Sequence, residues 1–289
     1  MRDYLALTKP RITWLILIST GVGYFFGLPL GLWRNSLITA LTWPLLHTIV
    51  GTGLMASGTA ALNQWAERDS DRWMRRTAGR PIPAGRLPAG SALVFGLAIS
   101  LAGFLELTYG VNLLAGLLGL FTLVSYLCLY TPLKRRSWVS TAVGALPGAM
   151  PPLIGFAAAH GRLTEEAWLL AGILFLWQFP HFYAIAWMYR EDYARAGIRM
   201  LPVVEADGDS TVRQILLYAA ALLLVSLAPA WMGMAGRLYA AGALILGVWM
   251  LRAGWRLAVE RSNAGARRVL MTSVVYLPAL YALMMLDRA

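Results

Sequence analysis

Long apolar runs alternate with short polar segments along the whole chain. A run of about 20 apolar residues is long enough to cross the hydrocarbon layer of a membrane as a helix. One soluble core in a chain of 289 residues does not need so many of these runs. The pattern predicts nine membrane-spanning helices, at residues 12–32, 41–62, 91–107, 113–133, 139–158, 167–188, 215–231, 239–257 and 269–286.

The polar segments between the runs carry most of the charge and predict the orientation. With nine helices, 21 of the 25 lysines and arginines fall on one side of the membrane. Positive residues collect on the cytoplasmic side, so we expect a cytoplasmic amino terminus and an external carboxyl terminus. An eight- or ten-helix topology would break this alternation. No cleavable signal or transit segment is visible, which favours a cell membrane of bacterial type.

Composition supports an integral membrane protein. Apolar residues make up 58% of the chain and charged residues 13%, against about half and a quarter in soluble domains. The net charge of +11 comes from residues in short loops between apolar runs, which is typical of membrane proteins. We therefore expect a lipid bilayer and no nucleic acid as partner. The chain is predicted to form one polytopic, all-α domain over residues 1–289.

The segment after the second run combines acids, an amide and arginines. If the helix continues past the run, Asn63, Glu67 and Asp71 recur at i, i+4 and i+8 and share one face. Their oxygen atoms suit Mg²⁺, which binds through one or two carboxylates plus substrate phosphates. Arg76 and Arg80 offer planar donors for phosphate oxygens. The segment predicts a magnesium–diphosphate site; the alternative is a solvated loop whose arginines pair with its acids.

Two further polar clusters lie along the chain. Lys134 and Arg135 follow the fourth run, where they are either phosphate ligands or a topological anchor. Gln178 and His181 lie inside the sixth run, where polar residues are costly and usually face a functional interior. A histidine there can ligate iron, or it can be satisfied by a helix neighbour. Pro180 between them is expected to open the helix locally.

These motifs together resemble those of the UbiA prenyltransferases, and within that family its heme-farnesylating branch. The match runs in order to about residue 205, and the last three runs match only as hydrophobic helices. The motifs are Leu7-Thr-Lys9-Pro10-Arg11, Asn63-x3-Glu67-x-Asp69-x-Asp71 with Met74-x-Arg76-Thr77-x2-Arg80-Pro81, Tyr130-Thr-Pro-Leu-Lys134-Arg135, and Trp177-Gln178-x-Pro180-His181-Phe182 with Asp192-Tyr193-x2-Ala196-Gly197 and Met200-Leu-Pro202.

The resemblance implies a UbiA-type bundle of nine helices that transfers farnesyl from farnesyl diphosphate to a vinyl group of heme b. Water is added and diphosphate is released. The implied cofactor is Mg²⁺, and its implied ligands, which are also the catalytic residues, are Asn63, Glu67, Asp71 and Asp192. The implied diphosphate ligands are Arg76, Arg80, Lys134 and Arg135, and the implied heme-binding residues are Gln178 and His181. A downstream heme A synthase or terminal oxidase assembly is the implied partner.

The sequence departs from the family pattern at two positions, and two rival functions remain open. Glu67 stands where aspartate is commoner, although both ligate magnesium. The second acidic motif of the family has two aspartates four residues apart, whereas here Asp192 is followed by Ala196 and only Glu191 is a nearby acid. Prenylation of a quinone or chlorophyll precursor would not need His181. A heme or lipid transporter would not need a carboxylate face beside an arginine cluster.

Overall fold

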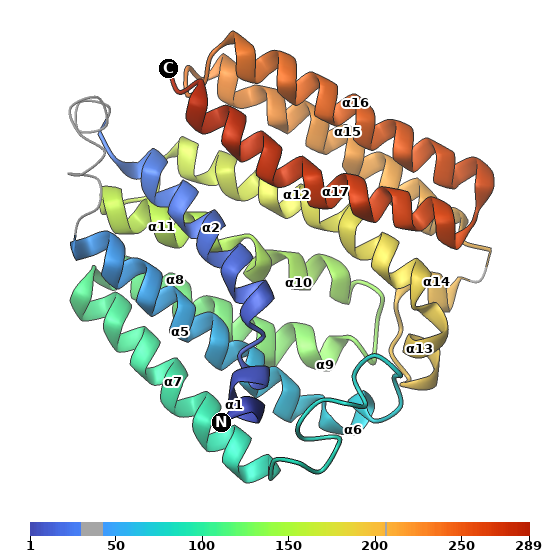
Figure 1. The fold of residues 1–289 in the computed structure, drawn as a ribbon. Helices are drawn as coiled ribbons and strands as arrows, with labels where there is room; N and C mark the ends of the chain where they lie inside the picture. Colours follow the sequence, from blue (N-terminus) through green and yellow to red (C-terminus); the bar gives the residue numbers. More distant parts are fainter. Residues whose placement is uncertain (30–42, 206) are drawn as a thin grey trace. The chain divides into compact units, whose positions relative to one another are not determined.

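The computed structural model describes residues 1–29, 43–205 and 207–289 and is helical (Figure 1). Within these ranges the strand-like pairing is a single bridge between Ala235 and Arg288. The elements are α1 Arg2–Leu7, α2 Pro10–Gly27, α5 Trp43–Ala66, α6 Arg68–Asp71, α7 Ala89–Gly110, α8 Leu113–Val124, the π-helix η1 Ser125–Tyr130, α9 Thr131–Leu133, α10 Ser140–Gly148, α11 Met150–His160, α12 Glu165–Met188, α13 Arg190–Arg195, α14 Leu201–Val204, α15 Asp209–Trp231, α16 Arg237–Glu260 and α17 Asn263–Leu286.

Eight helical stretches among the described residues are long and apolar enough to cross a membrane. They correspond to the second to ninth predicted runs, so the all-α, multi-pass prediction is confirmed. The predicted first helix is represented by α2, whose 18 residues begin with Pro10 and Arg11, which lower its mean hydropathy. Residues 30–32 and 41–42 of the first two predicted runs lie outside the described residues. The count of nine therefore stays a prediction.

Proline has different effects in two of the predicted runs. The fifth run contains Pro147, Pro151 and Pro152 and is divided at Ala149 into α10 and α11, because proline inside a span kinks or breaks the helix. By contrast, α12 continues through Pro180, so the expected local opening is wrong. A proline removes only one backbone donor. The buried side chains Phe179 and Tyr183 on either side hold the helix in its packed position.

The chain forms two compact units. Unit 1 comprises residues 1–133, 146–171 and 195–197, and unit 2 comprises residues 134–145, 172–194 and 198–289. In unit 1, α2 packs on α11 and α5 packs on α7. The α2–α11 approach depends on glycines, because a Cβ at Gly23 would meet the carbonyl oxygen of Pro152 and one at Gly155 would meet that of Thr20. Small residues let membrane helices approach this closely.

In unit 2, α15 packs on α16 and α16 packs on α17. One polar centre ties the three helices together inside their apolar contacts. The Tyr239 hydroxyl of α16 donates to the Ser226 carbonyl of α15 at 2.6 Å, and the Tyr276 hydroxyl of α17 donates to Ser226 Oγ at 2.9 Å. Interhelical hydrogen bonds of this kind hold membrane helices in register.

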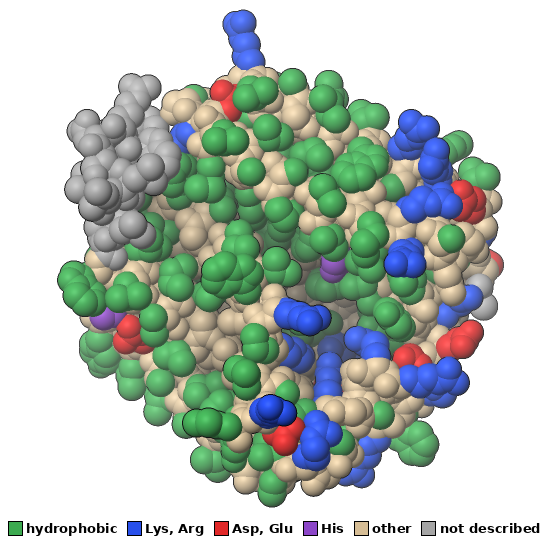
Figure 2. Space-filling model, viewed as in Figure 1, with side chains coloured by type: hydrophobic (Ala, Val, Ile, Leu, Met, Phe, Trp, Pro, Cys, Tyr) green, Lys and Arg blue, Asp and Glu red, His purple; other side chains and the backbone are tan. Residues whose placement is uncertain are grey.

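Much of the surface is apolar, as a lipid-facing surface should be. Figure 2 shows hydrophobic side chains spread over the visible face, with lysines and arginines gathered in groups. On α7, Leu97 and Leu101 are more than half exposed although the helix is long enough to span a membrane. Such a surface would be unfavourable in water and is favourable against hydrocarbon.

Candidate active site

Asn63, Glu67 and Asp71 lie on one continuous helical path at the junction of α5 and α6. The Glu67 amide donates to the Asn63 carbonyl at 2.9 Å, and the Asp71 amide donates to the Glu67 carbonyl at 2.9 Å. These i to i+4 bonds carry the helical geometry across the break between the two helices. The three side chains therefore project from the same side of the chain, one turn apart.

The amide of Asn63 is buried and held from two sides. Its Oδ1 lies 3.4 Å from Lys9 Nζ, and its Nδ2 lies 3.4 Å from Thr131 Oγ1. Thr131 follows the π-helix η1 and donates its own hydroxyl to the Tyr126 carbonyl at 2.9 Å. Departures from regular helix of this type are frequent at functional sites. Unit 1 thus fixes the orientation of Asn63 before any substrate binds.

Lys9 is the residue of this site to which the sequence pattern assigned no role. It adopts a left-handed backbone conformation, with φ 47° and ψ 62°, between α1 and α2. A residue with a side chain pays a steric penalty there, and strained positions cluster at functional sites. The available signal was the Lys9-Pro10 step before the first apolar run. Its contact with Asn63, 54 residues away, is not visible in a linear pattern.

Asp71 is fully buried, and its two carboxylate oxygens have different environments. Arg80 Nη1 donates to Oδ2 at 2.6 Å, whereas Oδ1 is buried without a hydrogen-bond partner among the described residues. The Thr77 hydroxyl donates to the Asp71 carbonyl at 2.9 Å and closes the loop between the acid and the arginine. Asp71 therefore presents one buried oxygen that the described protein atoms do not satisfy.

The protonation of Asp71 reflects this burial. Removal from water raises the pKa of its carboxyl group; Arg80 opposes the rise, and the neighbouring charge of Glu67 adds to it. The net shift is upward. A nearby cation stabilises an ionised carboxylate, so this position fits a divalent metal. Among the described residues, no three His, Cys, Asp or Glu side chains gather as a metal site. Mg²⁺ bound through substrate phosphates needs only one or two carboxylates.

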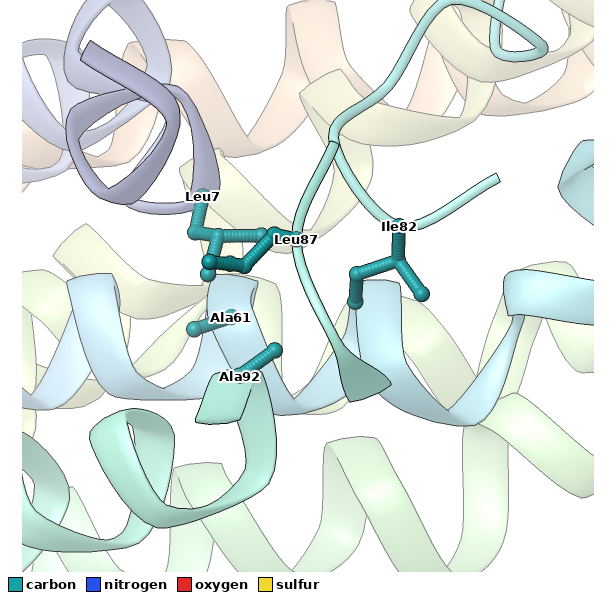
Figure 3. Close-up of a cluster of buried hydrophobic side chains, with 5 residues drawn as sticks. All are labelled: Leu7, Ala61, Ile82, Leu87 and Ala92. Atoms are coloured by element: carbon teal, nitrogen blue, oxygen red, sulfur yellow. The ribbon is translucent and has the colours of Figure 1, made fainter. Parts of the chain in front are cut away.

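A hydrophobic cluster anchors the loop that carries Arg76 and Arg80. Figure 3 shows its members on α1, on α5, on the loop and on α7: Leu7, Ala61, Ile82, Leu87 and Ala92. All five side chains are at most 8% exposed. At the same loop, Arg86 Nε donates to the Asp3 carboxylate of α1 at 3.0 Å. The arginines therefore belong to a packed loop, in which Arg80 is partly buried and Arg76 is exposed.

The remaining predicted diphosphate residues belong to unit 2. Asp192 lies in α13 and is 8% exposed, which is unusual for an acid in a short surface helix. Lys134 is half-buried and Arg135 is exposed. The Arg199 amide donates to the Lys134 carbonyl at 2.8 Å, which ties the segment before α14 to the predicted phosphate ligands. That these residues share one site with Asn63, Glu67 and Asp71 stays a prediction.

His181 is held in a defined orientation by α17. Its ring stacks on Trp177, with centroids 4.7 Å apart, and its Nδ1 lies 2.8 Å from Ser273 Oγ. The single hydroxyl hydrogen of Ser273 points to the Leu270 carbonyl at 2.6 Å. Ser273 Oγ therefore accepts from Nδ1–H, which leaves Nε2 of His181 with its lone pair. This is the tautomer of a histidine prepared to ligate a metal.

Gln178, one turn before His181, is buried and bonded within unit 2. Its Nε2 donates to the Ala145 carbonyl at 3.0 Å and to the Leu174 carbonyl at 3.2 Å. The first of these bonds connects α12 to α10. Gln178 therefore links α12 to α10, and its contact with heme stays a prediction.

Comparisons with known proteins agree with this architecture. The sequence pattern of the UbiA prenyltransferase family matches residues 16–276. The chain is similar to the protoheme IX farnesyltransferase of Solibacter usitatus, with 67% identity over 100% of this chain and 99% of that one. It is also similar to the protoheme IX farnesyltransferase of Koribacter versatilis, with 46% identity over 100% and 94%.

Solved structures show the same fold at low sequence identity. A structure from a study of digeranylgeranylglyceryl phosphate synthase in membranes has a TM-score of 0.80 at 14% identity, covering 99% of this chain and 97% of that one. A UbiA homolog from Archaeoglobus fulgidus bound to DMAPP and Mg²⁺ has a TM-score of 0.66 at 15% identity, covering 98% and 99%. At these identities the likeness establishes the fold alone.

Proposed function

Since the chain belongs to the UbiA prenyltransferase family, we propose that it transfers the farnesyl group of farnesyl diphosphate to a vinyl group of heme b. Family membership makes it a prenyltransferase, as the polar motifs predict, rather than a transporter. The observation that carries the choice of substrates is the 67% identity over its whole length to a protein named protoheme IX farnesyltransferase. The Asn63–Glu67–Asp71 face supports the diphosphate half of the reaction.

The proposed reaction joins three reactants. The C1–O bond of farnesyl diphosphate breaks, and both electrons leave with the diphosphate. The π electrons of a heme vinyl group form the new bond to farnesyl C1. The oxygen of water bonds to the neighbouring vinyl carbon and loses a proton. The products are heme O, with a hydroxyethylfarnesyl group, and diphosphate.

In the diphosphate half of the site, we propose that Asn63, Glu67 and Asp71 hold Mg²⁺. When bound, the metal neutralises charge on the leaving diphosphate oxygens. Asp71 suits this role because its Oδ1 has no hydrogen-bond partner among the described residues. Arg80 uses one N–H group on Asp71 Oδ2, so the acid orients a guanidinium whose other donors suit phosphate oxygens.

The proposal assigns the second half of the diphosphate site to unit 2. Asp192 would be the fourth metal ligand, and Lys134 and Arg135 would bind phosphate oxygens together with Arg76 and Arg80. The burial of Asp192 in a short helix of a basic segment supports this role, because a nearby cation stabilises a buried carboxylate. Asp69, which is exposed in α6, has no proposed role.

For heme b, we propose that Nε2 of His181 ligates the iron, with Gln178 as a neighbouring contact. The support is the orientation of the imidazole ring. Trp177 stacks on the ring, and Nδ1 of His181 donates a hydrogen bond to Ser273 Oγ. Donation from the remote nitrogen fixes the tautomer and raises the basicity of the ligating one. An axial ligand would also compensate the loss of hydration of an imidazole within a membrane span.

We further propose one nine-helix polytopic domain in a bacterial-type cell membrane, with α2 as the first span and the amino terminus in the cytoplasm. The charge distribution of the sequence supports this orientation. Farnesyl diphosphate and heme b both have a greasy body and a charged end, which suits a site near the membrane surface. The product would pass to a heme A synthase or a terminal oxidase assembly.

The test is pigment extraction from membranes of cells that make heme b and express this chain. The parent and Asp69→Asn should both yield a heme that elutes later than heme b on reversed-phase chromatography. Asp71→Asn should yield only heme b. The mass of the new pigment should equal that of heme b plus one farnesyl group and one hydroxyl group. A prenylated quinone precursor with no new heme would overturn the proposal in favour of another family reaction.

A further inference from the structure

The ends of α16 and α17 form a basic groove within unit 2. Nine residues line this cavity of about 640 Å³: Trp249, Arg252, Ala253, Arg256, Arg267, Arg268, Met271, Thr272 and Val275. The two helices belong to unit 2, pack on each other and are joined by a short turn (Figure 1). The ends that meet at this turn therefore lie at the same membrane surface.

The charge in the groove is unbalanced. Four of its lining residues are arginines and none is acidic. Arg268 pairs with Glu260, its Nη1 and Nη2 each 2.7 Å from a carboxylate oxygen. In the part of the chain that the structure describes, neither Arg252 nor Arg267 has a hydrogen bond or an ion pair. Like charges on neighbouring side chains repel each other, so an anion in the groove would stabilise it.

The position of Arg252 along α16 distinguishes this groove from the positive charges that anchor a helix at the membrane surface. Arg252 lies eight residues before the end of α16, about 12 Å along the helix at 1.5 Å per residue. An anchor needs its charge only at the membrane surface. An arginine two turns inside a span is costly and normally faces a partner. Met271 and Val275, each 49% exposed, continue the groove as an apolar floor deeper along α17.

We propose that this α16–α17 groove binds an anionic phospholipid. The arginines bind the phosphate headgroup, and one acyl chain lies along Met271 and Val275. A planar guanidinium donates two parallel hydrogen bonds to phosphate oxygens. Basic pockets between membrane helices recognise anionic lipid headgroups by the same chemistry. The proposal requires only that the chain is a multi-pass membrane protein, and it is independent of the proposed substrates.

The test uses the full-length purified protein in detergent and native mass spectrometry with an equimolar mixture of phosphatidylglycerol and phosphatidylcholine. The parent should retain phosphatidylglycerol in preference. Each arginine near a membrane surface contributes about fivefold to the binding of anionic lipid. The double variant Arg252→Gln/Arg267→Gln should therefore bind phosphatidylglycerol about 25-fold more weakly, two factors of fivefold. Arg237→Gln, at the opposite, exposed end of α16, is the matched control and should bind like the parent.

Three results would overturn the proposal. The first is equal retention of the two lipids by the parent. The second is displacement of phosphatidylglycerol by an equal concentration of inorganic phosphate, which would identify a site for the free anion. The third is a double variant that keeps its lipid preference and loses heme b binding, which would make the groove a propionate site. If the double variant aggregates, either exposed single variant should give a fivefold loss on its own.

Discussion

The substitution Asp71→Asn separates the chemical role of this side chain from its structural role. It keeps the shape of the residue and removes one negative charge. Loss of one preorganised charge-stabilising group typically lowers turnover by about 10²–10³-fold. We therefore expect heme farnesylation to fall by about that factor. Asp69→Asn makes the same chemical change on an exposed residue of the same short helix and should retain the parent rate.

The expected effect on stability is smaller because two contributions oppose each other. The variant loses a charge-assisted hydrogen bond to Arg80, a contribution of about 1.5–3 kcal/mol. It also no longer buries an ionised carboxylate, whose raised pKa shows that burial outweighs the attraction of Arg80. The net change in the free energy of unfolding at neutral pH should stay within about 2 kcal/mol.

The burial argument also predicts how the stability difference between the variant and the parent changes with pH. Because the folded-state pKa of Asp71 is raised, its protonated form stabilises the fold. That contribution is complete below the ordinary aspartate pKa of about 3.9 and is lost as the pH rises through the raised value. The amide that replaces the carboxyl group in the variant does not titrate. The stability of the variant relative to the parent should therefore increase as the pH rises above about 4.

Chromatography of the heme product gives the rates, and thermal unfolding in detergent at several pH values gives the stabilities. The reasoning is refuted if Asp71→Asn keeps more than about a tenth of the parent rate. A variant whose relative stability falls with rising pH would refute the burial argument by itself. The first result would mean that Asp71 serves to hold Arg80 and not to bind the metal, and the second would mean that the attraction of Arg80 outweighs burial.

Three further predictions use other parts of the chain. His181→Ala should weaken heme b binding, measured by absorbance titration, and leave calorimetric binding of diphosphate unchanged; unchanged heme affinity would make the histidine structural. Gly155→Ala should destabilise unit 1 by about 1–3 kcal/mol in thermal unfolding, because its Cβ meets the backbone of α2. Gly21→Ala should not, because no atom of the described residues outside its own helix lies within 4 Å of the added Cβ. Reporter fusions at Gly85 and Ala158 should lie on opposite sides of the membrane, and equal locations would contradict the nine-helix topology.

The positions of the membrane helices could be predicted because hydrocarbon imposes one simple requirement on a span. The ends of these helices could not be predicted in the same way, because the helices continue into polar residues beyond the apolar runs. Thus α17 begins at Asn263, six residues before the predicted run, where the Ser262 hydroxyl accepts from the Gly265 amide at 3.0 Å. A cap of this kind stabilises a helix start independently of hydrophobicity.

The acidic motif was predictable for a related reason: the spacing of Asn63, Glu67 and Asp71 is itself the period of a helix. The unequal environment of the Asp71 oxygens was not, because it depends on how the loop folds back to place Arg80. The contact of Lys9 with Asn63 was also missed, since it joins residues far apart in the chain. Local periodicity fixes which side chains share a face, whereas burial and long-range partners require the fold.

The hydrophobic cluster beneath the arginine loop has a consequence for biosynthesis. Its members run only from Leu7 to Ala92, so every side chain that anchors the loop is made in the first third of the chain. Proteins made on the ribosome fold from the amino terminus onward. The loop with Arg80 can therefore close over Asp71 while the ribosome is still translating, a hundred codons before Asp192 is added. In the nascent chain, the ion pair of Asp71 and Arg80 would then form before the later helices insert into the membrane.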